Sequence, residues 1–409
     1  MFRRLIVIVT AAILFSSSLT LAQTKKPKLP DEFPPNPLEI TTPDPLLPRS
    51  SKDKQPLTLQ EQQKLEPALD ALNQEAAAKL QAGDQVAAFE IWNRELRLRR
   101  FLGSLAEVQS LSRVGAIAWK QNDGQEVKYI TERLQAIQKE AQSQKTTAQI
   151  DLELWRSLGQ AYQNVRSPKL AVEAYDPVLL VVRQQKNTTA VVEMLKTIGE
   201  LHLSWFDYPK AAPVYEELLG LATSEGERGN EVTYLQRLAY IYEETKQPQQ
   251  SLKVLNKLAE IYVSANNLTE IPELKLAIAS NYESLAKEDS NLLLEAFKNY
   301  QEAYTTAWQL KEYVRAGEAL QKLIALYRSQ GQIEEALQAS QILVQTEAQA
   351  ANFYGLMQAY DQIGQLYLER KEFPQALTAF QKGLELAQQL KHEEAYFTGQ
   401  IEKVSKANL

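Results

Sequence analysis

The stretch Met357–Gly383, MQAYDQIGQLYLERKEFPQALTAFQKG, predicts two helices joined by a short turn. Apolar and small residues recur three and four positions apart in each half, which places them on one side of a helix. They are Tyr360, Ile363, Gly364 and Tyr367 in the first half, and Ala376, Phe380 and Leu384 in the second. Pro374 fits near the start of the second helix, where its missing N–H would be unpaired anyway. We therefore expect a helical hairpin here.

This hairpin resembles the tetratricopeptide repeat (TPR) in the spacing of its small and aromatic residues. Small residues at Gly364 and Ala376 would let the two helix backbones approach closely, and Tyr367 and Phe380 would fill the space beside them. One such hairpin cannot cover its own apolar side, so it needs neighbours in a stack.

The same pattern recurs upstream at intervals of roughly 40 residues, longer than the usual TPR period of about 34. The anchor position is a small residue in most hairpins: Ala76, Gly115, Gly159, Gly199, Ala239, Ala279, Ile324 and Gly364. The second hairpin matches least well, and an insertion within Lys287–Leu293 predicts a longer turn in the sixth. Other helical-pair families with a looser consensus could share part of this pattern.

The repeats predict an all-α fold, a right-handed superhelical solenoid of stacked antiparallel helix pairs. Eight anchors imply about 16 helices, and apolar residues at helical spacing within Glu393–Val404 add a C-terminal capping helix. The repeat domain is expected to span residues 57–409 and to begin at a Thr58/Glu61 capping box. Pro67 predicts that the leading helix breaks early.

Residues 1–22 have the order of a secretory signal peptide. Arg3 and Arg4 precede an apolar run, Leu5–Phe15, and small residues lead up to Ala22. The run is short for a membrane-spanning helix, which needs about 20 apolar residues. We expect cleavage after Ala22 and export, to the periplasm or to the thylakoid lumen of a photosynthetic host, with no membrane insertion afterwards. An uncleaved N-terminal membrane anchor is the alternative.

Residues 23–56 hold nine of the seventeen prolines in the chain. Such a segment cannot propagate a helix and is expected to be a disordered, extended linker. A ligand for a proline-reading domain is the other interpretation of these prolines.

Composition argues against several kinds of chemistry. The net charge of −6 becomes more negative once Arg3 and Arg4 are removed, which argues against nucleic-acid binding. The chain has no cysteine and two histidines. His202 occupies a position where other hairpins carry tyrosine, and His392 lies among acidic residues without a second ligand at metal-binding spacing. No nucleotide-binding loop or nucleophile motif is present. We therefore expect no catalytic residue, cofactor or metal.

The TPR resemblance implies that the first helix of each pair lines an inner, partner-binding face. Carried onto this sequence, the partner-binding positions are Glu153, Arg156, Gln160, Glu193, Lys196, Glu200, Gln236, Tyr240, Glu243, Glu283, Gln321, Arg328, Asp361 and Gln365. Acidic residues outnumber basic ones in this set, which favours a basic protein or peptide partner. A solvated acidic surface without a partner would look the same.

The expected function is a non-catalytic scaffold or adaptor that binds a protein or peptide. Signal, linker, hairpins and cap use nearly all of the 409 residues, which leaves no room for an ordinary catalytic domain. The alternative is a cell-envelope enzyme of the cell-wall hydrolase type, or its substrate-gripping helical domain. That enzyme would need a catalytic carboxylate in an apolar pocket.

Overall fold

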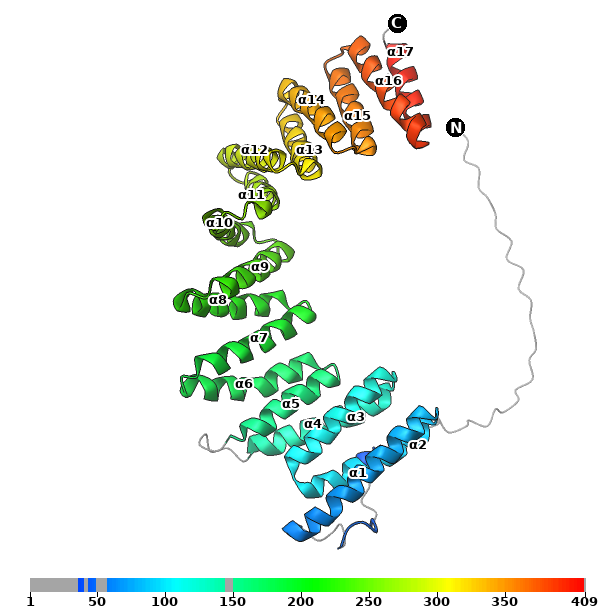
Figure 1. Ribbon diagram of the computed structural model, residues 1–409, viewed down its shortest axis with the longest axis vertical. Coiled ribbons are helices and arrows are strands. Elements are labelled where there is room, and N and C mark those ends of the chain that lie inside the picture. The colour runs from blue at the N-terminus through cyan, green and yellow to red at the C-terminus, as the bar shows by residue number, and fades with distance from the viewer. Residues whose placement is uncertain (1–35, 40–42, 49–56, 144–149, 408–409) are drawn as a thin grey trace, which may run out of the picture. The chain divides into compact units, whose positions relative to one another are not determined.

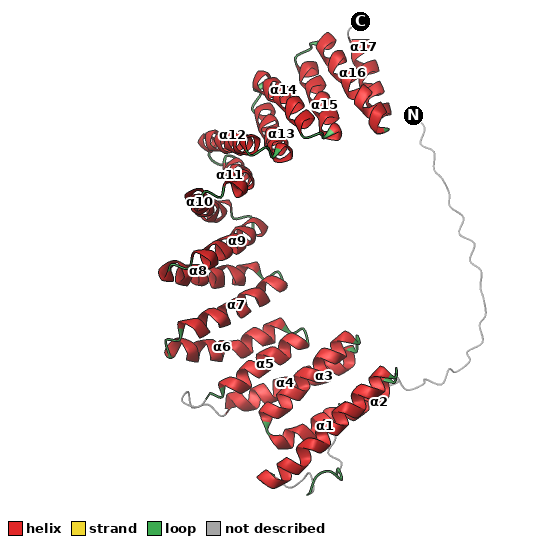
Figure 2. Ribbon diagram, in the orientation of Figure 1, coloured by secondary structure: helices red, strands yellow, loops and turns green. Residues whose placement is uncertain are grey.

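The computed structural model describes residues 36–39, 43–48, 57–143 and 150–407 (Figure 1). Within these ranges the regular structure is entirely helical, with seventeen α-helices and no strand (Figure 2). Consecutive helices pack as antiparallel pairs at α1/α2 and from α5/α6 to α15/α16, and α17 packs on α16. The predicted all-α array of paired helices with a C-terminal capping helix is confirmed. The expected signal, residues 1–22, lies outside the described residues.

The helices fall in the order expected from the anchors. They are α1 (Leu59–Gln81), α2 (Gln85–Arg99), α3 (Ser104–Lys120), α4 (Gly124–Ser143), α5 (Leu152–Asn164), α6 (Pro168–Gln184), α7 (Thr188–Ser204), α8 (Tyr208–Glu225), α9 (Arg228–Glu244), α10 (Pro248–Ser264), α11 (Ile271–Leu285), α12 (Leu293–Gln309), α13 (Tyr313–Ser329), α14 (Ile333–Gln349), α15 (Phe353–Glu369), α16 (Phe373–Leu390) and α17 (Glu394–Ala407). The odd-numbered members of the pairs are called first helices below. The chain divides into two compact units, residues 1–107 with 128–133, and 108–127 with 134–409.

In the first unit, α1 begins at the predicted capping box. The Glu61 carboxylate accepts the Thr58 backbone N–H at 2.7 Å, and the Thr58 hydroxyl accepts the Glu61 N–H at 3.4 Å. Pro67, however, lies inside α1, so the predicted break is wrong. Leu65, Leu69 and Leu72 are buried on one side of α1, and their burial outweighs the one backbone hydrogen bond that proline removes.

Two segments of the expected linker are ordered in the first unit. Pro37–Glu39 forms a single turn of 3₁₀ helix, and the Leu38 side chain is fully buried. The Asp44 carboxylate accepts two hydrogen bonds from the Arg94 guanidinium on α2, at 2.7 and 2.9 Å. For residues 36–39 and 43–48 the expectation of a disordered linker is therefore wrong. Proline prevents a long helix here, but it permits tight turns that pack against α2.

In the second unit, paired helices meet where a ring lies on a glycine. A β-carbon added to Gly159 would stand 2.3 Å from the Tyr175 ring, and one added to Gly364 would stand 2.6 Å from the Phe380 ring. The first-helix glycines Gly159 and Gly364 thus give room for aromatic rings of the second helices, which lie on the glycines rather than beside them. Gly383 on α16 makes the same contact with Phe397 of α17, which the repeat pattern did not predict.

The sixth pair has the longer turn that the insertion predicted. α11 ends at Leu285, a short 3₁₀ helix covers Ser290–Leu292, and α12 begins at Leu293. Most other turns within pairs have a residue with left-handed backbone conformation directly before the residue that caps the next helix, as at Arg166 and Lys246.

Candidate partner-binding surface

The predicted partner-binding residues lie mostly on the surface. Ten are exposed: Glu153, Arg156, Gln160, Glu193, Lys196, Glu200, Gln236, Tyr240, Glu243 and Arg328. The other four, Glu283, Gln321, Asp361 and Gln365, are half-buried. The repeat pattern therefore predicts exposed positions on the first helices more reliably for α5, α7 and α9 than for α11, α13 and α15.

Several of these residues are bound to tyrosines of their own unit. Glu283 accepts a hydrogen bond from the Tyr300 hydroxyl at 2.9 Å, and Asp361 accepts one from Tyr396 at 2.9 Å. Glu200 likewise accepts a hydrogen bond from Tyr215 at 2.8 Å, and burial and this carboxylate raise the pKa of Tyr215. These carboxylates hold helices together, so a structural role competes with partner binding at their positions.

The remaining charges are more balanced than the sequence suggested. Arg328 pairs with Glu369, and Arg237 lies 3.2 Å from Glu200. Within the described residues, the side chains of five charged predicted positions make no ion pair or hydrogen bond: Glu153, Arg156, Glu193, Lys196 and Glu243. Lys196 lies over the Tyr234 ring with its Nζ 6.0 Å from the ring centroid. A basic partner therefore stays a prediction, and the free charges here have both signs.

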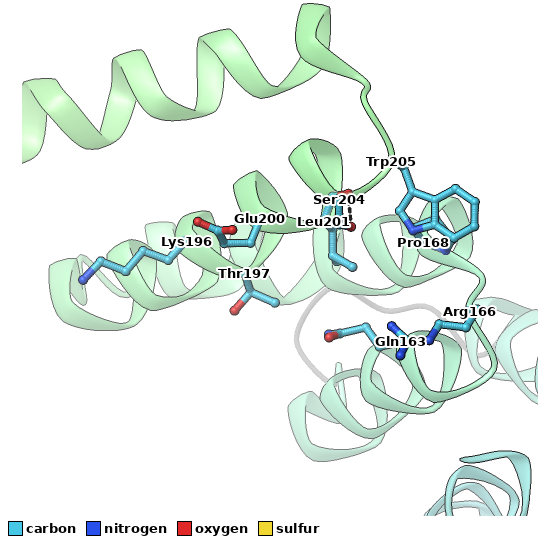
Figure 3. A pocket seen from close by; sticks show the side chains of 9 residues that line it. All are labelled: Gln163, Arg166, Pro168, Lys196, Thr197, Glu200, Leu201, Ser204 and Trp205. Atoms are coloured by element: carbon cyan, nitrogen blue, oxygen red, sulfur yellow. Dashed lines mark hydrogen bonds between the residues drawn. The ribbon is translucent and has the colours of Figure 1, made fainter. Parts of the chain in front are cut away.

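A cavity of about 510 Å³ opens where α5, α6 and α7 meet (Figure 3). Its lining combines charged, polar and apolar side chains: Gln163, Arg166, Pro168, Lys196, Thr197, Glu200, Leu201, Ser204 and Trp205. Lys196 and Glu200 had been predicted as partner-binding residues. The cavity has the size and mixed lining of a pocket that takes a side chain or short peptide segment.

Trp205 belongs to a row of aromatic side chains that ends on a first helix, and within this row only Tyr208 is half-buried. Trp205 is 52% exposed and Phe206 is 72% exposed. The Phe206 and Tyr208 rings make an edge contact with centroids 6.2 Å apart, and the Tyr208 and Tyr240 rings make another at 5.8 Å. The Tyr208 and Tyr240 hydroxyls are 3.0 Å apart, and this hydrogen bond raises the pKa of Tyr208 to about 12. Exposed aromatic rings at a cavity mouth are typical anchor points for protein partners.

Phe206 is the functional candidate that the sequence reasoning missed. Its φ of 58° places it in the left-handed region, where the equivalent turns carry Arg166, Lys186 and Lys246. A bulky aromatic residue is uncommon in that conformation, and strained residues of this kind gather at functional sites. This exception is visible in the sequence, because Phe206 stands where those turns carry arginine or lysine. It could have identified Phe206 as a functional candidate.

A second cavity of about 670 Å³ is also lined by Trp205 and Phe206, together with residues of α6 and α8. His202 lines it, with Nδ1 3.6 Å from an Asp207 carboxylate oxygen, and burial lowers the pKa of His202. His202 is half-buried, as expected for a packing substitution, whereas His392 is exposed. Among the described residues, no group of three histidine, cysteine or acidic side chains could hold a metal ion.

The enzyme alternative needs a protonatable carboxylate in an apolar pocket. Asp176 lines the second cavity, where partial desolvation by neighbouring side chains raises its pKa. Lys169 and Lys210 line the same cavity, and the Asp176 side chain is exposed to solvent. This is a mixed polar surface rather than the apolar enclosure that raises a catalytic acid toward neutrality. No helix in the described part of the chain has both the length and the apolar character needed to cross a bilayer.

No protein-family model matches this sequence, and a search of curated proteins finds no match either. Among solved structures, the chain is similar to BtubC (BKLC) from P. vanneervenii, with 17% identity over 55% of this chain and 90% of that chain, at a TM-score of 0.38. A STAND signal-transduction ATPase with a tetratricopeptide repeat sensor from Pyrococcus horikoshii has 11% identity over 87% of this chain and 51% of that chain, at 0.42. A Rap protein complexed with Competence and Sporulation Factor has 13% identity over 83% of this chain and 98% of that chain, at 0.32. Since these TM-scores are low, the description of this chain as an array of paired helices rests on its own consecutive helix pairs and their glycine-to-ring contacts.

Proposed function

We propose that the chain is a non-catalytic scaffold or adaptor that binds a protein or peptide on the first-helix face of α5, α7 and α9. This face is defined by Arg156, Lys196 and Gln236, which stand three residues before successive anchors. The observation that carries the proposal is the aromatic row from Trp205 to Tyr240, in which Trp205 lines the 510 Å³ cavity.

The proposed binding surface combines exposed aromatic side chains with nearby charged side chains that make no ion pair within the described residues. Aromatic side chains that fill or cover a pocket supply most of the binding energy in protein interfaces, and charged side chains around them fix register and specificity. Here Trp205 and Tyr240 would act as anchors, with Arg156, Glu193 and Glu243 as the surrounding charges. Since free charges of both signs are present, the partner segment is expected to be amphipathic, with basic residues opposite Glu193 and Glu243.

The chain is further proposed to work outside the cytoplasm, because residues 1–22 read as an export signal. If cleavage follows Ala22, the protein recovered with its partner will begin at Gln23 on N-terminal sequencing. A first residue of Met1 would instead support the uncleaved anchor.

Replacing Trp205 is expected to weaken partner capture strongly. Loss of a central aromatic anchor costs about 2 kcal/mol or more, which is roughly a thirtyfold loss of affinity. We expect Trp205→Ala to reduce the partner recovered by the tagged, exported chain by at least about tenfold, as measured by quantitative mass spectrometry.

The matched control is Trp119→Ala on α3, because Trp119 is 48% exposed, close to the 52% of Trp205. The control should capture as much partner as the unaltered chain. Equal losses in both variants, or no loss in either, would contradict the assignment of the binding surface. Release of cell-wall fragments by the purified chain would favour the enzyme alternative instead.

A further inference from the structure

Two short turns of the same kind lie in the proline-rich region before α1. In Asn36-Pro37-Leu38, the Asn36 side-chain oxygen accepts the Leu38 N–H at 2.9 Å. In Asp44-Pro45-Leu46, the Asp44 carboxylate accepts the Leu46 N–H at 3.0 Å. The backbone closes each turn as well, with Glu39 N donating to Asn36 O and Leu47 N donating to Asp44 O. The sequence thus contains an Asx-Pro-Leu turn twice, and the described residues 36–39 and 43–48 are called the arm below.

Three arginines on one side of α2 and just after it contact the arm. Arg94 binds the Asp44 carboxylate through Nε and Nη2, at 2.7 and 2.9 Å. Arg97 donates to the carbonyl oxygen of Pro37 at 2.7 Å, and Arg100 donates to that of Leu38 at 2.7 Å. Residues three apart share one side of a helix, so Arg94, Arg97 and Arg100 form a single arginine row. The arginine row binds the side-chain carboxylate of the Asp44 turn and the backbone carbonyls of the Asn36 turn.

Leucines of the arm add apolar contacts beside the arginine row. Leu38 is fully buried, and Leu46 and Leu47 pack against the leucine cluster of α1 and α2, which contains Leu57, Leu65, Leu69, Leu72 and Leu98. The arm therefore combines apolar anchors with charge-assisted and carbonyl hydrogen bonds. This combination is how peptides are bound by protein surfaces.

We propose that the arm is an intramolecular ligand, and that the arginine row of α2 is a binding site for proline-containing peptides with the Asx-Pro-Leu turn. The arm withholds this site and its leucine cluster from other chains while it is bound. The arm precedes α1 in the same chain. This covalent connection gives the arm an effective concentration of about millimolar at its site, so a free peptide at micromolar concentration cannot displace the arm.

The test is the binding of a fluorescent peptide of residues 35–48, PNPLEITTPDPLLP, to full-length chains by fluorescence anisotropy. The unaltered chain should not bind it at micromolar concentration. A chain with Leu38→Ala and Asp44→Ala should bind it at least about tenfold more tightly, because its own arm has lost the buried leucine and the carboxylate. Adding Arg94→Ala to that chain should weaken binding again by about tenfold or more, because a bidentate charge-assisted contact is lost.

The controls distinguish specific recognition of the peptide from unfolding of the chain and from binding of the arm to a second copy of the chain. Helical circular dichroism should be alike in the variants, and Arg183→Ala, which removes an equivalent two-bond contact between an arginine and Glu217 in the second unit, should leave peptide binding unchanged. A peptide carrying the Asp44→Ala change should bind poorly to every chain. Failure of the arm variant to bind the peptide, or binding that is unaffected by Arg94→Ala, would overturn the proposal. Dimerisation of the unaltered chain in light scattering at the same concentration would show that the arm binds a second copy and would contradict an intramolecular ligand.

Discussion

Gly159→Ala is expected to lower the free energy of unfolding, although alanine is the better helix former. The added methyl group would stand 2.3 Å from the Tyr175 ring, well inside van der Waals contact. Tyr175 is 5% exposed, and its hydroxyl accepts a hydrogen bond from Gln163 at 2.6 Å, so the ring has little room to move. Overpacking of this kind costs about 1–3 kcal/mol, against a helix-propensity gain of about 1 kcal/mol. The measurement is denaturant or thermal unfolding followed by circular dichroism.

The matched control is Gly220→Ala in the interior of α8. Gly220 is exposed, and a β-carbon added there would meet nothing within 4 Å. The same substitution should therefore stabilise the chain by about 0.5–1 kcal/mol. We therefore expect Gly159→Ala to lower the free energy of unfolding and Gly220→Ala to raise it.

A double variant with Gly159→Ala and Tyr175→Leu should lose less stability than the two single changes together, because the smaller side chain gives room to the methyl group. Stabilisation by Gly159→Ala alone would mean that the helices do not meet through this contact.

Phe397→Ala is expected to undock the C-terminal helix without unfolding the rest of the second unit. Phe397 is 1% exposed and lies directly on Gly383, in a cluster with Phe380, Ala387 and Val404. Removing a buried phenylalanine costs about 3–5 kcal/mol. Because α17 packs on α16, at the end of a repeat array, the loss should stay local.

Hydrogen exchange with mass spectrometry would show this locality. Amides of α16 and α17 should exchange about a hundredfold faster or more, whereas those of α5 to α10 should keep their rates. Phe206→Ala is the control, because the Phe206 side chain is 72% exposed and its removal leaves no cavity. A uniform rise in exchange through the whole array would contradict a fold held together by nearest-neighbour contacts.

The helical hairpins could be predicted from the sequence because the same physical requirement recurs in each pair. A small residue at Gly159, Gly199 or Gly364 and a ring sixteen residues later fix the register, and repetition makes chance agreement improbable. The predicted helix break at Pro67 was wrong because it considered the local effect of proline without the buried leucines of α1, which stabilise the helix. Tertiary packing outweighed a local preference there.

The surface was harder to predict than the fold, because exposure does not follow from register alone. Glu283 stands at the register of exposed Glu243, and Asp361 stands at that of exposed Lys196, but tyrosine hydroxyls bind Glu283 and Asp361 within the array. The arm was missed for a related reason. Its prolines exclude a long helix, yet the affinity of Asp44 for Arg94 arises from residues fifty positions apart, and composition alone cannot show that contact.

The most direct test of partner binding by the first-helix face is photo-crosslinking of the full-length chain in its native cells at six positions, one at a time. Three lie on first helices at equal register, Arg156, Lys196 and Gln236, and three lie on the second helices α6, α8 and α10, at Leu180, Gly220 and Glu260, all exposed. We expect one and the same protein or peptide adduct at the first three positions and none at the second three. Adducts confined to Leu180, Gly220 and Glu260, or none at any position, would contradict it.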